Sequence, residues 1–492
     1  MWYSLDSIVS WAKRRWFVYQ WSGIYWWLAN SWDLWPYWSL LRKNILDSWV
    51  KTFVQKRKDI IFLDSAILMN PKVWEASGHI ANFSDPLVDD KNTWERFRVD
   101  KIIEEKIENW RQNERKSEND IIQILKEDFW VENLIPESWT FDQMKSFIEK
   151  YIPNNPNNWK KANWTNIRKF NLMFKTFQWV IEDDSSTIYL RPETAQGIFI
   201  NFKNILDTTR VNIPFWIAQV WKAFRNEITP WNFLYRLREF EQMEIEYFVE
   251  PEKDEKYFEN WKKDSLNWRT DEIWINKENL RFRDHEKDEL SHYSAWTVDI
   301  EYKFPWWWWE LEGIARRTNY DLKQHQAFSG ENMQYSDPKT WKRYIPRVIE
   351  PSWWLTRWIL TTMLDAYDEE SYTDSQWRTQ TRVVVHFHYN IAPIKFAVLP
   401  LVDKSDDQVK IAEDLFEKLS EKFVCEIDYK WNIGKRYRRQ DEIWTPYCIT
   451  IDFDTLKDWT VTVRDRDSMK QIRIKIDELS SIDLNKLSKM FK

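Results

Sequence analysis

Glycine is the residue type that this chain of 492 residues lacks most clearly. The sequence holds 6 Gly but 37 Trp, whereas ordinary usage of about 7% would give roughly 34 glycines. Tryptophan stands where a backbone without a side chain would fit better, at Trp26 and Trp27, at Trp35 before a proline, at 306–309 and at Trp354. Consecutive indoles cannot all be buried with a partner for each N–H, whereas glycines there would permit tight turns. We hypothesise that many of these positions are UGA codons read as glycine in the source organism; a genuinely tryptophan-rich protein is the alternative.

Cysteine is also scarce, and long hydrophobic runs are absent. The two cysteines, Cys425 and Cys448, form no CxxC pair, which speaks against a disulfide framework and against a cysteine-bound zinc site. No apolar run approaches the ~20 residues that cross a bilayer, and residues 1–15 lack the order of a secretory signal. We therefore expect a soluble, cytoplasmic protein without a membrane contact.

The chain has no excess of positive charge either. Its formal net charge is −6 at pH 7, so any contact with RNA would have to come from a local patch. One candidate patch consists of Lys435, Arg436, Arg438 and Arg439. Taken alone, such a patch is more often a solvated face. The histidines show no HxxxH spacing, which favours structural roles over metal binding.

Hydrophobic periodicity divides the chain near residue 390. Strand patterns recur at 187–190, 215–220, 241–249 and 297–304, and helical patterns at 41–56 and 353–366. The mixture predicts an α+β domain over 1–390 that is built on an antiparallel sheet. Charged helical stretches at about 101–165 and 251–292 indicate two insertions. After residue 390 short strands alternate with helices, which predicts an α/β module over 391–492.

One segment has a pattern suited to a nucleotide. Activation of a carboxylate by ATP brings two negative groups together, so it needs cations beside the phosphates. In the run FRNEITPWNFLYRLREFEQMEIEYF, which covers 224–248, two strand-like stretches flank a loop. Arg225 near the end of one stretch could fork onto a phosphate, with Glu227 on the same face. Alone, this Arg-x-Glu pattern is more often a surface ion pair.

The same run resembles motif 2 of class II aminoacyl-tRNA synthetases, in the form typical of bacterial glycyl-tRNA synthetases. Other blocks resemble that family in the same order along the chain: KRRWFVYQWSGIYWWLANSWDLWPYW, LDSAILMNPKVWEASGH, YLRPETAQGIF, DIEYKFPWWWWELEGIARR, VIEPSWWLTR and YRRQDEIWTPYCITIDFDTL. At almost every block the mismatch is Trp for an expected Gly, as at Trp231. The resemblance implies a class II catalytic domain on an antiparallel sheet, followed by an anticodon-binding domain over 391–492.

The resemblance also implies the reaction, which is ligation of glycine to tRNA(Gly). Glycine and ATP would form glycyl-adenylate and pyrophosphate, and glycine would then pass to the 3′ end of the tRNA with release of AMP. No covalent nucleophile or general base is needed, because the carboxylate of glycine attacks the α-phosphate directly. Such an enzyme requires ATP with Mg²⁺, and no other cofactor is expected.

Residues for ATP follow from the same resemblance. Arg225 would contact the α-phosphate, Phe240 would stack on adenine, and Arg357 would hold the γ-phosphate of bent ATP. Glu310 would hold a magnesium ion. The full expected set is Arg225, Asn226, Glu227, Tyr235, Arg236, Phe240, Glu310, Leu311, Trp354 and Arg357. Arg225, Glu227 and Arg357 would carry catalysis.

The resemblance also assigns a glycine pocket. The ammonium group of glycine requires carboxylates, and its missing side chain requires a rigid wall, since an apolar sieve gains only about 1–3 kcal/mol per methylene. The expected pocket consists of Arg98, Glu193, Phe240, Glu244, Arg316, Glu350 and Ser352. We leave Glu312 and Arg317 outside it as an internal ion pair.

Partners follow from three further features. Pro71 matches the dimer-interface proline of class II enzymes, which implies a C2 homodimer. Beside an anticodon-binding domain, the basic cluster at 435–439 is expected to face tRNA. Many relatives carry a cysteine-rich zinc knuckle after motif 1, but the matching stretch VDDKNTWERFRVD has no cysteine. We therefore expect no zinc.

Two other functions compete with this interpretation. The same fold serves as a DNA polymerase accessory subunit that binds nucleic acid without aminoacylating, but such a protein need not keep Arg225, Glu227, Glu310 and Arg357. A class II ligase for another amino acid is the second alternative. Glu193 and the full-length glycyl-type blocks argue against it.

Overall fold

The computed structural model describes most of the chain. The described ranges are 5–15, 17–20, 22–25, 31–178, 186–228, 233–291, 293–373, 377–402 and 404–491. Three of the suspected glycine positions, Trp26, Trp27 and Trp231, lie outside these ranges. None of the helices in the described part is both long enough and apolar enough to cross a membrane.

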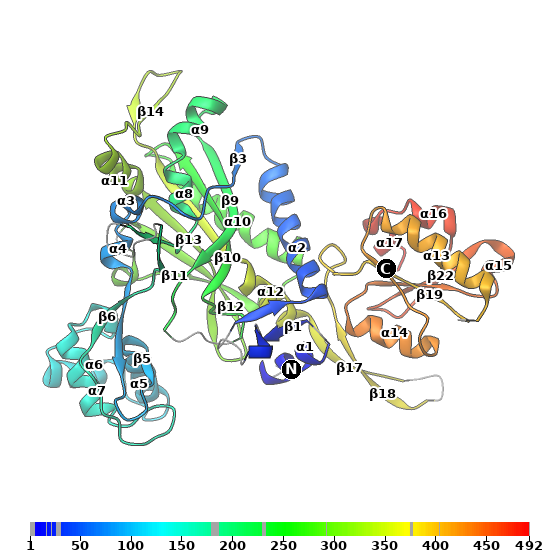
Figure 1. The fold of residues 1–492 in the computed structure, drawn as a ribbon, viewed down its shortest axis with the longest axis horizontal. Coiled ribbons are helices and arrows are strands. Elements are labelled where there is room, and N and C mark those ends of the chain that lie inside the picture. The colour runs from blue at the N-terminus through cyan, green and yellow to red at the C-terminus, as the bar shows by residue number, and fades with distance from the viewer. Residues whose placement is uncertain are drawn as a thin grey trace.

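A seven-stranded sheet organises the larger body of the molecule (Figure 1). Its strands, in the order β11-β12-β13-β16-β10-β9-β3, are β11 (Leu280–Asp284), β12 (Trp296–Lys303), β13 (Trp308–Thr318), β16 (Arg347–Trp354), β10 (Glu239–Val249), β9 (Phe215–Phe224) and β3 (Ile60–Leu63). Every neighbouring pair is antiparallel except β3 and β9, which run parallel. The α+β fold with an antiparallel sheet is thus confirmed. Strand β11 lies inside the stretch 251–292, so this stretch, which was expected to be helical, is helical only in part.

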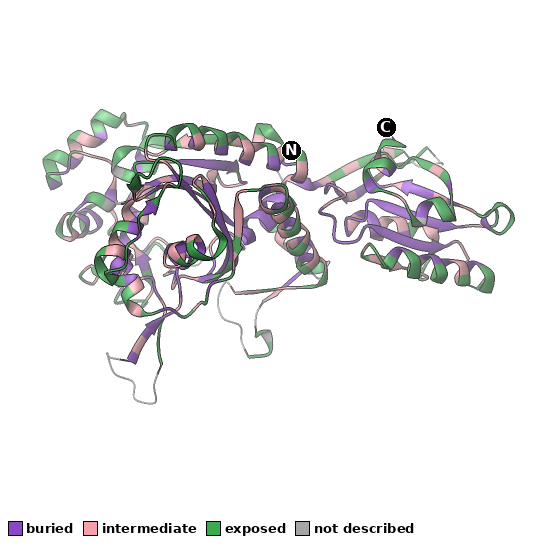
Figure 2. Cartoon of the chain, turned by 90° about the horizontal axis from the view of Figure 1, so that it is seen from above, coloured by how far each residue is buried: buried purple, intermediate pink, exposed green. Residues whose placement is uncertain are grey.

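Helices cover both faces of this sheet. On one face α2 (Pro36–Trp49), α10 (Asp254–Asn267) and α12 (Leu355–Ala366) share a core with Ala218 of β9 and Ile245 of β10. On the other face α8 (Ala195–Phe199), α9 (Phe202–Thr209) and α11 (Tyr320–Ser329) pack on neighbouring strand positions such as Ile217 and Phe248. Because successive strand residues point to opposite faces, both faces can be apolar. Figure 2 shows these strands buried beneath helices whose outer sides are exposed.

Shorter elements complete this body. They are α1 (Leu5–Arg14), β1 (Val18–Gln20), β2 (Trp32–Leu34), α3 (Pro71–Ala76), α4 (His79–Asn82), β7 (Lys175–Phe177), β8 (Thr187–Tyr189), β14 (Tyr335–Ser336) and β15 (Arg343–Tyr344). Helix α2 continues as a π-helical turn over Val50–Gln55.

A separate lobe, at the lower left of Figure 1, contains most of the first expected insertion. It consists of the sheet β5-β4-β6, with β4 (Ser84–Asp89), β5 (Arg96–Arg98) and β6 (Arg168–Asn171), and of helices α5 (Val99–Gln112), α6 (Glu118–Phe129) and α7 (Phe141–Tyr151). Ser117 and Thr140 begin α6 and α7 with capping boxes, which satisfy free N–H groups of the first turn. The lobe has its own core, which includes Ile103, Leu125 and Phe147.

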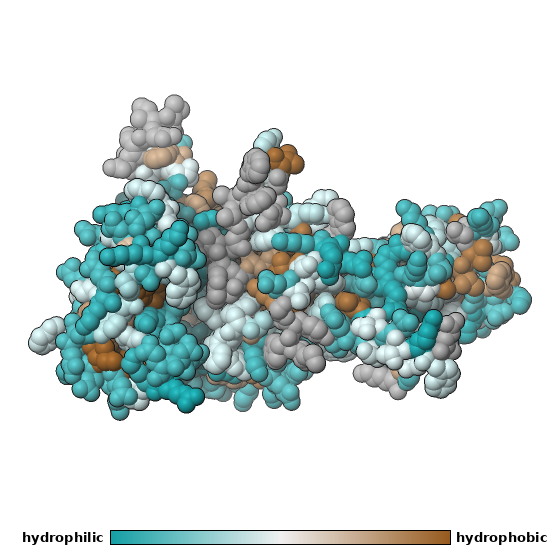
Figure 3. All heavy atoms as spheres, turned by 90° about the horizontal axis from the view of Figure 1, so that it is seen from below, coloured by the Kyte–Doolittle hydropathy of each residue, from teal (hydrophilic) through white to brown (hydrophobic). Residues whose placement is uncertain are grey.

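The C-terminal module lies at the right of Figure 1 and is built on the sheet β20-β19-β21-β22-β23. Its strands are β19 (Phe396–Pro400), β20 (Cys425–Ile427), β21 (Tyr447–Ile451), β22 (Thr460–Asp465) and β23 (Gln471–Lys475), and its helices are α13 (Asp406–Ser420), α14 (Ile433–Glu442), α15 (Thr455–Asp458), α16 (Ile476–Ser480) and α17 (Leu484–Lys489). The hairpin of β17 (Tyr367–Thr373) and β18 (Thr379–Val385) leads into it. Figure 3 shows a face on which hydrophilic residues predominate over both bodies.

Left-handed backbone conformations fall mostly on tryptophan. Of the 15 described non-glycine residues with positive φ, nine are tryptophans with φ between 58° and 78°: Trp94, Trp130, Trp159, Trp274, Trp341, Trp377, Trp431, Trp444 and Trp459. A bulky side chain rarely adopts this conformation, which glycine adopts freely. Trp130 and Trp459 end helices α6 and α15 in the left-handed conformation, where glycine is the usual residue.

Buried indole groups give a second anomaly. Among the described residues, the indole N–H of nine tryptophans is buried without a hydrogen-bond partner: Trp11, Trp38, Trp49, Trp74, Trp216, Trp261, Trp353, Trp358 and Trp444. Buried indole N–H groups normally find a partner. Side chains added at positions meant for glycine would leave such donors, so both anomalies favour the recoding hypothesis.

Candidate active site

Strand β10 brings the expected ATP and glycine residues to one face of the large sheet. Because side chains alternate along a strand, Phe240, Gln242, Glu244 and Glu246 all point to the α8 side. On β16, Ser352 lies opposite Glu244 and Trp354 lies opposite Gln242. The two strands therefore place the residues for both substrates on one continuous surface, with the expected adenine contact at one end and the carboxylates farther along.

Two arginines and two aromatic rings form the ATP end of this surface. The rings of Phe240 and Trp354 stack with centroids 4.1 Å apart and an angle of 10° between their planes. The guanidinium carbon of Arg225 lies 4.9 Å from the centre of the Trp354 ring, and that of Arg357 lies 3.9 Å from it. The indole of Trp354 thus fills the space beside Phe240, between the two cations, where an adenine would be expected to stack.

Arg357 is fixed by the backbone around it. Its Nε donates to the carbonyl of Tyr235 at 3.2 Å, and its Nη1 lies 3.1 Å from the carboxylate of Glu310. The Tyr235 hydroxyl donates to the carbonyl of Glu310 at 2.9 Å. Burial lowers the pKa of Arg357, but Tyr235 and Glu310 outweigh it and leave the pKa raised. A permanent cation is thus held at the expected phosphate end.

The remaining ATP residues are placed unequally. Glu227 is buried and lies 3.8 Å from Arg236. The backbone N–H of Asn226 donates to the carbonyl of Leu172 at 2.7 Å, and Asn226 and Phe240 both line a cavity of about 970 Å³. The side chain of Leu311 lies in the hydrophobic core. It cannot contact ATP, so any contribution from this position must come from its backbone.

A β-bulge directs Glu310 toward the site. Glu310 pairs with Glu301 while Glu312 pairs with Ile300, so Leu311 is the extra residue of the bulge. An ideal Cβ on Gly313 would lie 3.7 Å from Oδ1 of Asp299 and 3.9 Å from Oε1 of Glu310. Two carboxylate oxygens therefore converge over this glycine, and carboxylate oxygens are the protein ligands that Mg²⁺ prefers.

Glu193 is held at the other end by groups from three elements. Gln196 of α8 donates to its Oε1 at 2.9 Å, His79 of α4 lies 3.3 Å from its Oε2, and Arg317 of β13 lies 3.8 Å away. Burial raises the pKa of Glu193, but His79, Arg317 and the hydrogen bond from Gln196 outweigh this effect and leave the pKa lowered. Glu193 is therefore a buried, ionised carboxylate.

Glu244 of β10 and Glu350 of β16 lie on the same face of these two neighbouring strands, two register positions apart. Thr194 donates its hydroxyl to Glu244, and Arg317 donates from Nη1 to Glu350. Burial, together with the charges of Glu350 and Glu193, raises the pKa of Glu244 to about 8. Ser352, half-buried opposite Glu244, borders the same space. Buried carboxyl groups thus gather where an ammonium ion would be bound.

Two arginines exchange the places that the sequence predicted for them. Arg316 contacts Asp254 of α10 at 2.8 Å, whereas Arg317 contacts Glu350 and pairs with Asp321 at 2.9 Å. The prediction of Arg316 for the glycine pocket is therefore not supported, because alternation on β13 turns it to the opposite face. The expected pair of Glu312 with Arg317 is also wrong, since Glu312 is buried against Arg269 and Ser265.

The described contacts of Arg98 are with aspartates rather than with the glutamates of the expected glycine pocket. Its guanidinium pairs with Asp100 and lies 3.2 Å from Asp85. Burial lowers the pKa of Arg98, but the charges of Asp100 and Asp85 outweigh this effect and leave the pKa raised. The charge of Glu227 adds a smaller contribution in the same direction. The small lobe thus contributes a cation whose charge acts on Glu227 of motif 2.

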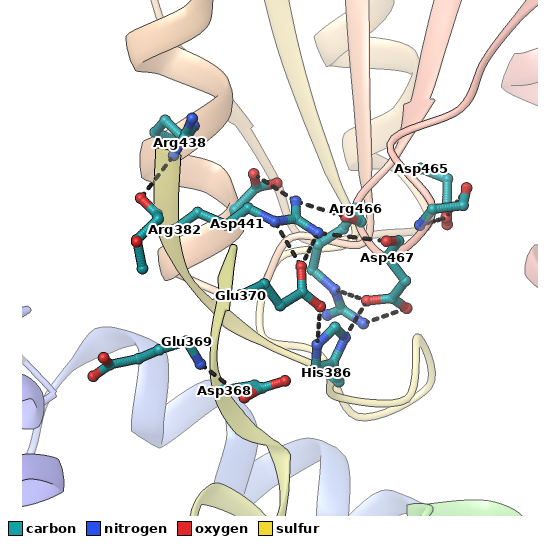
Figure 4. Close-up of polar contacts among 12 residues, drawn as sticks. Asp368, Glu369, Glu370, Arg382, His386, Arg438, Asp441, Asp465, Arg466 and Asp467 are labelled. Atoms are coloured by element: carbon teal, nitrogen blue, oxygen red, sulfur yellow. Dashed lines mark hydrogen bonds and ion pairs between the residues drawn. The ribbon is translucent and has the colours of Figure 1, made fainter. Parts of the chain in front are cut away.

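Most of the basic cluster of α14 (Ile433–Glu442) contacts other groups of the protein itself. Arg436 is buried and donates to the carbonyl of Pro400 at 2.6 Å, so it cannot belong to a surface patch. Arg439 pairs with Asp428 at 2.9 Å. Arg438 donates to the carbonyl of Thr381 on the β17–β18 hairpin (Figure 4). Of the four predicted residues, Lys435 is the one that is exposed.

Figure 4 shows that charged residues at the end of α14 contact the β17–β18 hairpin. Arg382 of β18 donates to Glu370 at 2.6 Å and to Asp441 of α14 at 3.1 Å. His386 lies 2.9 Å from Glu370 and 2.7 Å from Asp467. The hairpin and the module are thus joined by buried or half-buried charged contacts.

Sequence reasoning missed several residues of the glycine end. Thr194, Gln196, Arg317 and Asp321 are all buried and contact the predicted glutamates or one another. The block YLRPETAQGIF contains the first two, and strand alternation across GIARR could have separated Arg317 from its neighbour. No sequence pattern marks Asp321 as a site residue, because it reaches the site only through the position of the first turn of α11.

Comparisons with known proteins agree with this geometry. Residues 395–486 match the family model described as an anticodon binding domain. The glycine–tRNA ligase of Acetivibrio thermocellus is 52% identical over 478 residues, which are 97% of each chain. That of Clostridium acetobutylicum is 52% identical over 476 residues, again 97% of each, and that of Staphylococcus epidermidis is 50% identical over 479 residues, 97% of this chain and 98% of its own.

A solved structure shares the fold at much lower identity. The prolyl-tRNA synthetase of Cryptosporidium parvum, complexed with L-proline and AMP, is 13% identical with a TM-score of 0.59, over 99% of this chain and 75% of that one. This likeness supports the arrangement of catalytic sheet and C-terminal module. With relatives at about half identity over nearly its whole length, the chain belongs to the glycine–tRNA ligases, which have the class II aminoacyl-tRNA synthetase fold.

Proposed function

We propose that this chain activates glycine with ATP and transfers it to tRNA(Gly). One observation carries the proposal: strand β10 presents a cation-flanked aromatic site and a pocket of buried carboxyl groups on the same face. The first suits a nucleotide and the second suits a small ammonium compound. Their adjacency is what the joining of an amino acid to an adenylate requires.

The residues would act by position and charge. Glu193, Glu244 and Glu350 hold the ammonium group of glycine, which leaves its carboxylate directed toward the ATP end. Arg225 stabilises the charge that develops on the α-phosphate as the carboxylate oxygen attacks it, and Arg357 stabilises the departing pyrophosphate. Glu310 and Asp299 would hold Mg²⁺, which neutralises phosphate charge when it is bound. No side chain needs to remove a proton.

The working enzyme requires glycine at position 354. As written, the indole of Trp354 stacks on Phe240 and lies against both arginines, so ATP cannot occupy the same space. Glycine there would leave Phe240 free for the adenine base. Together with the nine left-handed tryptophans, this steric conflict supports recoding of UGA as glycine.

Assembly and location are part of the same proposal. Residues 1–390 form the catalytic domain, with insertions at 101–165 and 251–292, and 391–492 bind the anticodon region of tRNA. Pro71 begins α3, and Phe62 and Leu68 before it are 51% and 55% exposed. Exposed apolar side chains beside an edge strand suit a C2 homodimer interface. The enzyme would act in the cytoplasm.

A charging assay tests the proposal. Protein made with glycine at the left-handed positions and at 354 should attach labelled glycine to a tRNA(Gly) transcript in the presence of ATP. A transcript lacking its 3′ terminal adenosine is the control and should accept none. If glycine is activated but never reaches the intact transcript, the tRNA part of the proposal is wrong.

A further inference from the structure

Glu246 is a buried glutamate of β10 that the proposed reaction does not use. Its exposed fraction is 0%, and among the described residues neither carboxyl oxygen accepts a hydrogen bond from an N–H or O–H group. It lies two residues beyond Glu244 and therefore on the same face of the strand. A buried carboxyl group without a donor is costly unless it is neutral or shares a proton.

Its neighbours are the carboxyl groups of the glycine pocket. Glu244, Glu246 and Glu350 each offer an oxygen within 4.8 Å of the others. Residue 246 falls between the β10–β16 pairs Glu244–Ser352 and Tyr247–Ile349, which places Glu350 across from it. Glu350 contacts Arg317, and Glu244 accepts from Thr194. Glu246 has neither kind of support.

The charges around this pocket do not balance if every acid is ionised. Glu193, Asp321 and the three clustered glutamates face two described arginines. Arg317 contacts Glu193, Asp321 and Glu350, and the buried Arg191 interacts with the charge of Glu244. His79 of α4 lies beside Glu193, and the aromatic Tyr293 lies against Arg317. Excess negative charge among buried groups is relieved when one acid binds a proton. The acid that lacks a cation or donor is the one that gains most from doing so.

We propose that Glu246 is a positioning residue of the glycine pocket, which remains protonated and donates its O–H to Glu350. This bond would fix the Glu350 carboxylate between Arg317 and the ammonium group of glycine. It would also keep the net charge of the pocket low enough for a single ammonium ion to balance. The inference rests on the proposed function of this site.

The direction of titration agrees with this placement of the proton. Burial raises the pKa of Glu246 well above its usual value, and the neighbouring charge and hydrogen bond of Glu350 raise it further. Burial also raises the pKa of Glu350, but there Arg317 opposes the effect at direct contact. Of the two, Glu350 is therefore the acceptor and Glu246 the donor.

Two substitutions separate this role from a purely structural one. Glu246→Gln keeps the shape and a permanent N–H donor, whereas Glu246→Leu keeps the volume without a donor. In the enzyme with glycine at the recoded positions, we expect E246Q to keep the KM for glycine within about 3-fold, while E246L raises it at least about 10-fold, the effect of one lost hydrogen bond to a charged group. The KM for ATP should stay within about 2-fold in both, since Phe240 and Arg357 are untouched.

The outcomes are distinct. If E246Q impairs glycine binding as much as E246L, an ionised Glu246 is required and the inference is wrong. If E246L leaves the KM for glycine unchanged while remaining folded by circular dichroism, Glu246 positions nothing. The infrared difference between the parent and E246Q at neutral pH tests the proton directly even if E246L unfolds: the parent should show the band of one additional protonated carboxyl group, since Glu244 contributes equally to both. A parent without glycine-dependent exchange would instead overturn the proposed function itself.

Discussion

The glycine end and the ATP end of the catalytic sheet differ in how completely their side chains are arranged. At the glycine end, Glu193 and Arg317 are buried and hydrogen-bonded to groups from α8, α11 and β16. At the ATP end, Arg225 and Arg357 are in place, but the ring of Trp354 lies between them. The glycine end therefore has its side chains in place, whereas the indole of Trp354 fills the ATP end.

The difference teaches where an added side chain does most harm. The glycine pocket is built from side chains, so its construction does not depend on glycine residues in the protein. The nucleotide site depends on close approach of a ligand to the backbone of β16, which only glycine allows. Exchange of glycine for tryptophan would therefore damage the ATP end first.

The largest effect is expected from Trp354→Gly. We expect this change to raise the rate of glycine-dependent ATP–pyrophosphate exchange by at least about 100-fold, or ~2.7 kcal/mol, because it frees the ring of Phe240 and both arginines. Exchange of labelled pyrophosphate into ATP measures it. The control is W341G, which removes an equally large indole from a position that is 86% exposed. Equal gains in both variants would mean that the indole of Trp354 does not block the ATP end of the site.

Arg357→Ala should give the next largest effect, in protein with glycine at position 354. Loss of the cation at the phosphate end should lower kcat by about 100-fold or more, while the KM for glycine changes little. Steady-state kinetics with each substrate varied separately will show this. Arg343→Ala, on exposed β15, is the matched control. A rise in the KM for glycine alone would contradict the separation of the two ends.

A pH dependence should reveal the glycine end. The pKa of Glu244 is raised to about 8, so the folded state favours its protonated form. Its stabilising effect is complete below the ordinary glutamate pKa and is lost as the pH rises through about 8, with a slope of up to ~1.4 kcal/mol per pH unit. We expect E244Q to flatten the fall in unfolding free energy between about pH 5 and 8. Denaturant titrations at several pH values measure it, and an unchanged slope would mean that Glu244 is ionised in the fold.

The smallest effect should come from left-handed positions away from the site. Trp130→Gly, at the end of α6 with φ 58°, should stabilise the protein by about 1 kcal/mol because glycine adopts this conformation without strain. W130A is the control, since alanine also lacks the indole but keeps the Cβ. Thermal unfolding distinguishes them. Equal stabilisation by both would show that the gain comes from losing the exposed ring.

Strand alternation made much of the fold predictable. The runs that became β9, β10 and β12 alternate or are continuously apolar, and the change of texture near residue 390 marks the C-terminal module. Strand β11 was missed because Leu280–Asp284 is charged and exposed at the sheet edge. The β17–β18 hairpin was missed because its strands carry polar residues that are satisfied by the module, as Glu370 is by Arg382.

The site was predictable where a motif fixes the residue and unpredictable where packing does. Phe240, Glu244 and Glu350 lie where the motifs placed them, on adjacent strands. Arg316 and Arg317 were exchanged because the motif match alone does not say which face of β13 a residue takes, whereas alternation across GIARR would have separated them. Arg436 was misplaced because α14 buries one face of a basic helix.

The most direct test of the central claim is glycine-dependent ATP–pyrophosphate exchange, compared with alanine and serine, in enzyme with glycine at the recoded positions. A rigid pocket that ends at buried carboxyl groups predicts exchange with glycine and little or none with the two larger amino acids. Absence of exchange with glycine, or equal exchange with alanine, would contradict the account.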